Sequence, residues 1–205
     1  KILKNLMTKN IAIIGAGGHG KVVGEIALLN QYEIINFFDD KENEIKEFPF
    51  IISGNIDYLK QHLKDYDAFF VAIGENKKRF NLIEWLKKQK INIVNLIHPR
   101  STISTFSTLG IGTCVMANAV INPGTEIKEG VIINSSASID HDCEIEDFVH
   151  ISPNCSLSGC VRVGKFSHLG TGTSVHPSIH IGSNVKTAVG SKVFKNILDD
   201  KIHKD

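Results

Sequence analysis

The sequence lacks a long apolar run and an excess of either charge. No window approaches the about 20 apolar residues of a transmembrane helix, and residues 1–10 lack the apolar core of a signal peptide. Lys and Arg number 23 against 22 Asp and Glu, so the formal charge of +1 argues against nucleic-acid and membrane partners. These absences predict a cytoplasmic enzyme or binding protein.

Cysteine is also scarce. The four cysteines contain no C-x-x-C pair, which argues against a zinc site. Cytosolic thiols normally stay reduced. We therefore interpret Cys114, Cys143, Cys155 and Cys160 as packing residues and expect no metal.

The second half of the 205 residues repeats itself. An aliphatic residue recurs at every sixth position from Ile103 to Val193, and Thr187 is the one break in the series. A small or β-branched residue lies four positions after each member, as at Ala119 and Val131. A period of six is not helical, and the β-branched bias suits short strands. Residues 103–193 therefore predict a β-helix of hexapeptide repeats with roughly five coils.

The first half alternates between strands and helices. Apolar spacing predicts strands at 10–15, 33–38, 68–73 and 93–97, and helices at 21–30, 56–66 and 76–89. This order predicts a parallel sheet with covered faces. His98-Pro99 looks like a boundary, so we expect one domain over residues 1–98 and a second over 99–205.

A glycine-rich turn follows the first predicted strand. Gly15-Ala16-Gly17-Gly18-His19-Gly20 fits G-x-G-x-x-G, in which backbone N–H groups and a helix N-terminus approach a diphosphate. Asp39 and Asp40 follow about twenty residues later, where a carboxylate could bind a ribose or a base, or cap a turn. About 90 residues make one mononucleotide-binding half of a doubly wound fold. A nucleotide-sugar therefore fits this half better than the dinucleotide of an oxidoreductase.

The repeat register places the histidines of the second half. His141 falls at a corner, whereas His150 and His168 each precede an inward position. An exposed histidine without a function is the alternative for any one of them. His150 and His168 are separated by three hexapeptide repeats, so we expect them to stack in adjacent coils.

Four motifs resemble one family. The segment Asn134-Ser135-Ser136-Ala137-Ser138-Ile139-Asp140-His141-Asp142-Cys143 is similar to the catalytic segment of the hexapeptide-repeat acyltransferases that O-acetylate sialic acid or N-acetylate bacillosamine. The glycine loop, the acidic pair and Asn95-Leu96-Ile97-His98 resemble the same family. This resemblance implies a Rossmann-like α/β domain, then a left-handed parallel β-helix with three six-residue faces per coil. It also implies a homotrimer with its sites between neighbouring β-helices.

The resemblance also implies residue roles. His141 would be the catalytic base and Asp142 its orienting partner. His150 and Gly159 would lie near the thioester of acetyl-CoA, whereas Asn134 and His19, with the glycine loop, would bind the nucleotide-linked sugar. The chain departs from the family in its last ten residues, where members usually carry Gly-x-Pro-Ala.

The implied activity is acetyl-CoA-dependent N-acetylation of a nucleotide-linked amino-deoxy sugar, with UDP as the expected nucleotide, in bacterial glycan or surface polysaccharide biosynthesis. Two alternatives stay open. One is O-acetylation of a sialic acid or a related sugar by the same base. The other is a non-catalytic protein that binds sugar nucleotides. Consumption of acetyl-CoA and the nature of the acceptor distinguish these three hypotheses.

Overall fold

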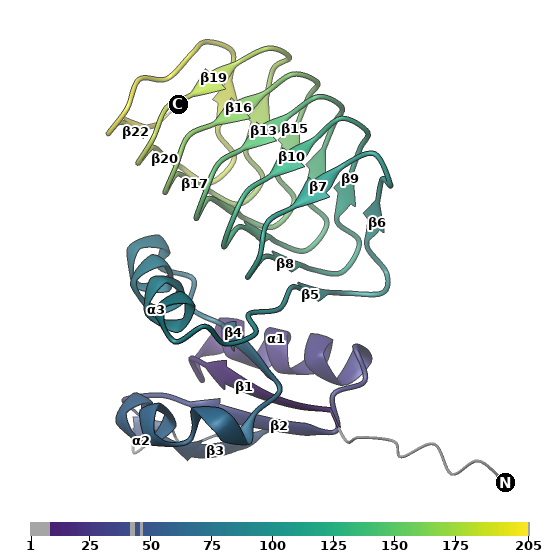
Figure 1. The fold of residues 1–205 in the computed structure, drawn as a ribbon. Coiled ribbons are helices and arrows are strands. Elements are labelled where there is room, and N and C mark those ends of the chain that lie inside the picture. The colour runs from purple at the N-terminus through teal and green to yellow at the C-terminus, as the bar shows by residue number, and fades with distance from the viewer. Residues whose placement is uncertain (1–8, 42–43, 46, 205) are drawn as a thin grey trace, which may run out of the picture.

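The computed structural model describes residues 9–41, 44–45 and 47–204. The chain forms an α/β domain followed by a β-helix, drawn below and above in Figure 1. This architecture confirms the predicted fold class. Among the described residues, no helix has the length and apolar character needed to span a membrane.

The α/β domain is built on a four-stranded parallel sheet with the order β3-β2-β1-β4. Its strands are β1 (Asn10–Ile14), β2 (Ile34–Phe38), β3 (Ile51–Gly54) and β4 (Ala68–Val71). Its helices are α1 (Gly18–Leu29), α2 (Ile56–Gln61), a 3-10 turn (Leu63–Asp65) and α3 (Asn76–Lys88). The sheet buries apolar side chains on both faces: Ile11 and Ile13 share a core with α1, and Ala12 and Ile14 share one with α3.

Three elements differ from the sequence prediction. The predicted helix at 56–66 ends at Gln61 and is followed by a 3-10 turn at Leu63–Asp65. The edge strand β3 is absent from that prediction, since it is only four residues long and Ile51 is 69% exposed, so it carries a weak pattern. The predicted strand at 93–97 is divided. Ile93 forms only an isolated bridge to Phe69, whereas β5 (Leu96–Ile97) pairs with the β-helix.

The β-helix consists of three parallel sheets made of two-residue strands. Sheet B contains β5, β8 (Cys114–Val115), β11 (Ile132–Ile133), β14 (His150–Ile151), β17 (His168–Leu169), β20 (Lys186–Thr187) and β22 (Ile202–His203). Sheet C contains β6 (Thr102–Ile103), β9 (Val120–Ile121), β12 (Ser138–Ile139), β15 (Ser156–Leu157), β18 (Ser174–Val175) and β21 (Lys192–Val193). Sheet D contains β7 (Thr108–Leu109), β10 (Glu126–Ile127), β13 (Glu144–Ile145), β16 (Arg162–Val163) and β19 (His180–Ile181).

Successive strands of a sheet come from successive coils and pair in register, as Ile133 does with Ile151. The predicted aliphatic series and the small residues four positions later form one continuous core, which includes Ile121, Ile139 and Ala137. The period of six thus predicted correctly which side chains are buried. Ile103 and Leu109 at the first coil are only partly buried, because few coils cover them.

Sheet B docks on the α/β domain. Cys114, Met116 and Ile132 share a buried core with Val23 and Ile26 of α1. Phe148, at the corner that leads into β14, packs edge to face on Phe80 of α3 with ring centroids 5.1 Å apart. The remaining two sheets face away from the α/β domain (Figure 1).

Arg79 of α3 joins the two parts. Its side chain is fully buried. The guanidinium donates to carbonyl oxygens of Ile73 and Gly74 in the α/β domain, to Oδ1 of Asn76, and to carbonyl oxygens of Gly130 and Phe148 in the β-helix, at 2.7–3.2 Å. Because burial disfavours its charge, the pKa of Arg79 falls to about 10, and the charge persists at neutral pH. One cation therefore satisfies buried acceptors on both sides of the junction.

We expect Arg79→Met to lower the free energy of unfolding by about 3–5 kcal/mol, because removing one partner of a buried charged network leaves the others unsatisfied. Urea unfolding followed by the fluorescence of Trp85, the single tryptophan, measures this change. Lys77→Met, which removes an exposed cation from the same helix, serves as the control. Equal midpoints for the two variants would contradict this role of Arg79.

Candidate active site

His141 lies at the corner between β12 and β13. Its Nδ1 is 2.8 Å from Oδ2 of Asp142, and the two side chains are 55% and 63% exposed. Asp142 adopts a left-handed conformation with φ of 56°, which turns its carboxylate back toward the preceding imidazole. The pair therefore presents an oriented imidazole to the exterior of the β-helix.

Neighbouring polar groups fix this corner. One carboxylate oxygen of Asp140 accepts hydrogen bonds from the backbone N–H of His141 and from Nδ2 of Asn122, each at 2.9 Å. The hydrogen bond to Asp142, with the nearby charge of Asp140, raises the pKa of His141 above its ordinary value of 6.5. Sequence reasoning named Asp142 but missed Asp140 and Asn122, although Asn122 precedes Asp140 by one full coil and so stacks on it.

Gly159 lies directly against the ring of His141. A Cβ at Gly159 would come within 2.6 Å of the His141 Cε1 and Nε2 atoms, so only glycine leaves room for the imidazole in this position. Of the two residues expected near the thioester, the structure therefore brings Gly159 to the corner that holds His141. It places His150 elsewhere.

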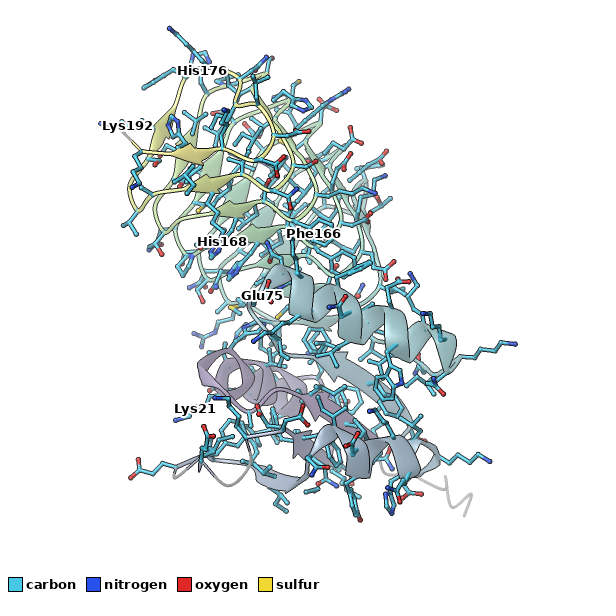
Figure 2. The ribbon with its side chains drawn as sticks, turned by 90° about the vertical axis from the view of Figure 1, so that its left-hand side faces the viewer. Lys21, Glu75, Phe166, His168, His176 and Lys192 are labelled. Atoms are coloured by element: carbon cyan, nitrogen blue, oxygen red, sulfur yellow. The ribbon has the colours of Figure 1, made fainter. Side chains whose placement is uncertain are left out.

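His150 lies on sheet B with Asn134. Its Nε2 is 3.3 Å from Nδ2 of Asn134, so these two predicted site residues meet. The imidazoles of His150 and His168 stack with centroids 4.4 Å apart and an interplanar angle of 5°, which confirms the stack expected from their spacing. Figure 2 shows His168 and Phe166 on the side of the β-helix next to Glu75 of the α/β domain. Around His150 this face is covered, because the first coils of sheet B dock on that domain.

His19 faces the same junction from the glycine loop. Burial and the nearby charge of Arg79 lower its pKa to about 4, and its Nε2 is buried without a hydrogen-bond partner among the described residues. Burial, with the charges of His168 and Arg79, lowers the pKa of His150 to about 3. Both imidazoles are therefore neutral at pH 7. A buried nitrogen without a partner indicates a position where a ligand can supply one.

A cavity of about 360 Å³ opens at the carboxyl ends of β1, β2 and β4, the edge at which α/β sheets bind ligands. Gly15, Asp39, Asp40, Lys41 and Lys78 contribute to its wall. The two lysines supply the positive charge that a diphosphate requires. Because Gly15 is part of its wall, the cavity lies beside the predicted glycine loop.

The glycines of this loop have two different tasks. A Cβ on Gly17 or Gly18 would meet no atom within 4 Å, so the helix N-terminus stays open to a ligand. Gly15 has a φ of +108°, and a Cβ on Gly20 would collide with the carbonyl oxygen of Gly15. Gly17 and Gly18 therefore leave space for a ligand, whereas Gly15 and Gly20 permit the turn itself.

Asp39 and Asp40 bind backbone amides in this structure. Asp39 accepts hydrogen bonds from the N–H groups of Ala16 and Lys41 at 2.8 and 2.9 Å, and Asp40 accepts one from Ile56 at 3.1 Å. These bonds correspond to the turn-capping alternative of the sequence analysis. Both residues also line the cavity.

The predicted site residues of the β-helix form two groups within one chain. His141, Asp142 and Gly159 lie at the corner between sheets C and D, whereas Asn134 and His150 lie on sheet B. In a three-sided coil, the corner between two sheets is opposite the third sheet. The corner that holds His141 and the face that docks on the α/β domain therefore lie on opposite sides of the β-helix.

Known proteins share both parts of this chain. The model of the PglD N-terminal domain matches residues 10–86. The acetyltransferase domain of PglB from Neisseria gonorrhoeae FA1090, solved in complex with acetyl coenzyme A, is 37% identical with a TM-score of 0.92, and the match covers 97% of each chain. This chain belongs to the PglD family of hexapeptide-repeat sugar N-acetyltransferases.

Two further relatives of this PglD-family chain carry informative names. PerB from Caulobacter crescentus, solved in complex with CoA and GDP-perosamine, is 31% identical with a TM-score of 0.90, covering 96% of this chain and 94% of that one. The UDP-N-acetylbacillosamine N-acetyltransferase of Bacillus subtilis strain 168 is 38% identical over 113 residues, or 53% of this chain. The match spans about half the length of that curated relative, 52%.

Titration of the imidazoles by NMR tests whether His141 differs in pKa from His19 and His150. We expect His141 to titrate above 6.5 and His19 and His150 to stay neutral down to pH 5, because their pKa values are lowered to about 4 and about 3. Asp142→Asn should lower the pKa of His141, since the variant removes the carboxylate that stabilises the imidazolium. A titration of His150 near 6.5 would contradict the covered face.

Proposed function

We propose that this protein transfers the acetyl group of acetyl-CoA to the amino group of a nucleotide-linked amino-deoxy sugar in glycan biosynthesis. The observation that carries the proposal is the 2.8 Å contact between His141 and Asp142 on an exposed corner of the β-helix. The names of the relatives support it, since they include an N-acetyltransferase and complexes with acetyl-CoA and GDP-perosamine.

The proposed chemistry begins at the acceptor. A sugar amine is mostly protonated near neutral pH and attacks only after it loses that proton, so a neutral imidazole must accept it. Asp142 binds Nδ1 of His141 and thereby leaves Nε2 as the base. Proton transfer to His141 then forms an imidazolium that the Asp142 carboxylate stabilises.

The new C–N bond forms as the amine attacks the thioester carbonyl directly, and the C–S bond breaks when the tetrahedral intermediate collapses. The nitrogen gives its second proton to solvent as the amide forms. The imidazolium of His141 returns its proton to the leaving thiolate, which restores the base. Gly159 supports this step, since its lack of a side chain opens the space beside Nε2 in which the thioester would lie.

The nucleotide part of the substrate would occupy the cavity of the α/β domain. Lys41 and Lys78 would face the diphosphate, and Gly17 and Gly18 would admit it to the N-terminus of α1. UDP is the nucleotide that we propose. Asn134 and His19 would then meet the sugar at the junction.

The separation of the two groups within one chain supports an oligomer. The amine reaches His141 only if a neighbouring chain brings its sugar-binding junction to the catalytic corner, because both groups of a single chain lie on opposite sides of the β-helix. We propose a homotrimer, in which a triangular β-helix contacts two neighbours. The division at residue 98 into a nucleotide-sugar domain and an acyltransferase domain belongs to the same proposal, as does a cytoplasmic location.

Loss of the base tests the catalytic role. His141→Ala should lower kcat by roughly 10²–10⁴, the usual contribution of a general base, and should leave the affinity for the nucleotide-sugar within a few-fold. Steady-state kinetics and calorimetry measure these quantities. His176→Ala, which removes an exposed imidazole from another part of the β-helix, is the matched control. A His141→Ala enzyme that keeps more than half of kcat would remove this residue from the mechanism.

The nucleotide cavity has a separate test. Gly17→Val should weaken binding of a UDP-sugar and leave binding of coenzyme A unchanged, since the new side chain enters open space rather than the protein core. Asp39→Ala should act in the same direction by releasing the Ala16 amide. Calorimetry with each ligand alone measures both effects. Equal losses for the two ligands would contradict the assignment to different parts of the chain.

Mixed oligomers test the shared site. His141→Ala and His150→Ala should each be inactive alone, whereas co-assembled chains should regain activity, because some interfaces combine an intact corner with an intact junction. Light scattering should give a mass near three times that of one chain. A fully active monomer at nanomolar concentration would overturn the arrangement and require a complete site within one chain.

A further inference from the structure

One cysteine is not a packing residue. Cys114, Cys143 and Cys155 are buried as expected, but the free thiol of Cys160 is exposed, which corrects the interpretation from sequence. Cys160 lies beside the proposed catalytic pair. One ligand atom each from His141, Asp142 and Cys160 falls within 4.8 Å of the other two.

The coil geometry holds this cluster together. Cys160 follows Asp142 by one full coil and occupies the same corner of the next coil, where both adopt left-handed backbone with φ of 60° and 56°. The backbone N–H of Cys160 donates to the carbonyl oxygen of His141 at 2.9 Å. The absence of a side chain at Gly159 lets the imidazole lie next to the thiol. The backbone therefore fixes the three residues, and only their side chains must adjust.

The donor set matches one class of ion. Thiolate, neutral imidazole and carboxylate are the ligands that Zn²⁺ takes in proteins, at about 2.0–2.3 Å, so tetrahedral ligands lie about 3.3–3.8 Å apart. Exposed side chains that already converge within 4.8 Å reach this spacing with shifts of about 1 Å. Water would complete the coordination, as in zinc sites with three protein ligands.

We propose that His141, Asp142 and Cys160 form an inhibitory site for a divalent ion of the zinc class. The proposed reaction does not require this ion. The inhibitory effect of the ion rests on the proposed role of His141. The ion binds Nδ1 of His141 and a carboxylate oxygen of Asp142 in place of the hydrogen bond between them, so the ring proton moves to Nε2 and the thiol proton of Cys160 goes to solvent. With Nε2 protonated, the imidazole can no longer accept a proton from the amine. Cys160 contributes the thiolate that makes the site selective for thiophilic ions over Mg²⁺.

Cobalt titration of the purified protein tests the site without any assay of activity. Co²⁺ should give tetrahedral visible bands and a near-ultraviolet thiolate-to-cobalt band at one equivalent, and Zn²⁺ should displace it. Cys160→Ser should lose the thiolate band, whereas Ser178→Ala, at the same corner one coil further, should keep it. A wild-type protein without the band, or a Cys160→Ser protein that retains it, would overturn the proposal.

Inhibition provides the second measurement. Zn²⁺ should inhibit the wild type reversibly, with recovery on addition of a chelator, and Mg²⁺ should not. Cys160→Ser should retain its activity in the absence of metal and require a roughly 10-fold or greater Zn²⁺ concentration for inhibition, because even indirect supports of a metal ligand contribute 10–100-fold in affinity. Equal Zn²⁺ sensitivity of both proteins would refute the inhibitory role. If transferase activity were absent, the proposed function would fail, and the cobalt spectra would still decide the metal site.

Discussion

The coil of three hexapeptides is the constraint on which the site depends. Because each coil returns to the same face, residues one coil apart are stacked at a fixed distance. The residue type at each position of the coil therefore determines which side chains are stacked on one another. This rule places Gly159 against His141 and stacks His168 on His150. It also puts Cys160 above Asp142. A short-strand solenoid thus builds a rigid array of side chains from local hydrogen bonds, with no long loop to order.

Arg79 connects the β-helix to the α/β domain. A β-helix face that docks on an α/β domain must bury backbone carbonyls at its corners, and burial of an unpaired carbonyl is costly. The guanidinium satisfies carbonyl oxygens of Gly130 and Phe148 and also binds Ile73 on the other side. Burial and, to a lesser extent, the charge of Arg79 lower the pKa of His19 to about 4, so that imidazole stays neutral at the junction. Arg79 therefore contributes to both the packing and the electrostatics of the junction.

The sequence predicted the β-helix well, since a period of six over many repeats leaves one consistent inward series, as Ile121, Ile133 and Ile139 show. The pairing of His141 with Asp142 came from the family resemblance of this segment rather than from the repeat, and the structure brings the two side chains into contact. The sequence did not predict the roles of Arg79 or Cys160. Arg79 resembles any cation on a helix with Lys77 and Lys78, and its burial depends on how two domains dock. Cys160 was expected to be buried because cysteine usually is, whereas its position at a corner of the coil exposes it.

The corner proposed to be catalytic is open to water in a single chain. His141 and Asp142 are 55% and 63% exposed within one chain, and water at that corner would compete for every hydrogen bond that the reaction needs. His19 lies across the β-helix, near Arg79 at the junction, and the cavity proposed for the nucleotide lies within the α/β domain beyond it. A rigid solenoid cannot bend to bring these surfaces together, since its core is continuous from coil to coil. The proposed neighbouring chain therefore both excludes water from the base and delivers the substrate to it. In this arrangement, catalysis at this surface depends on assembly.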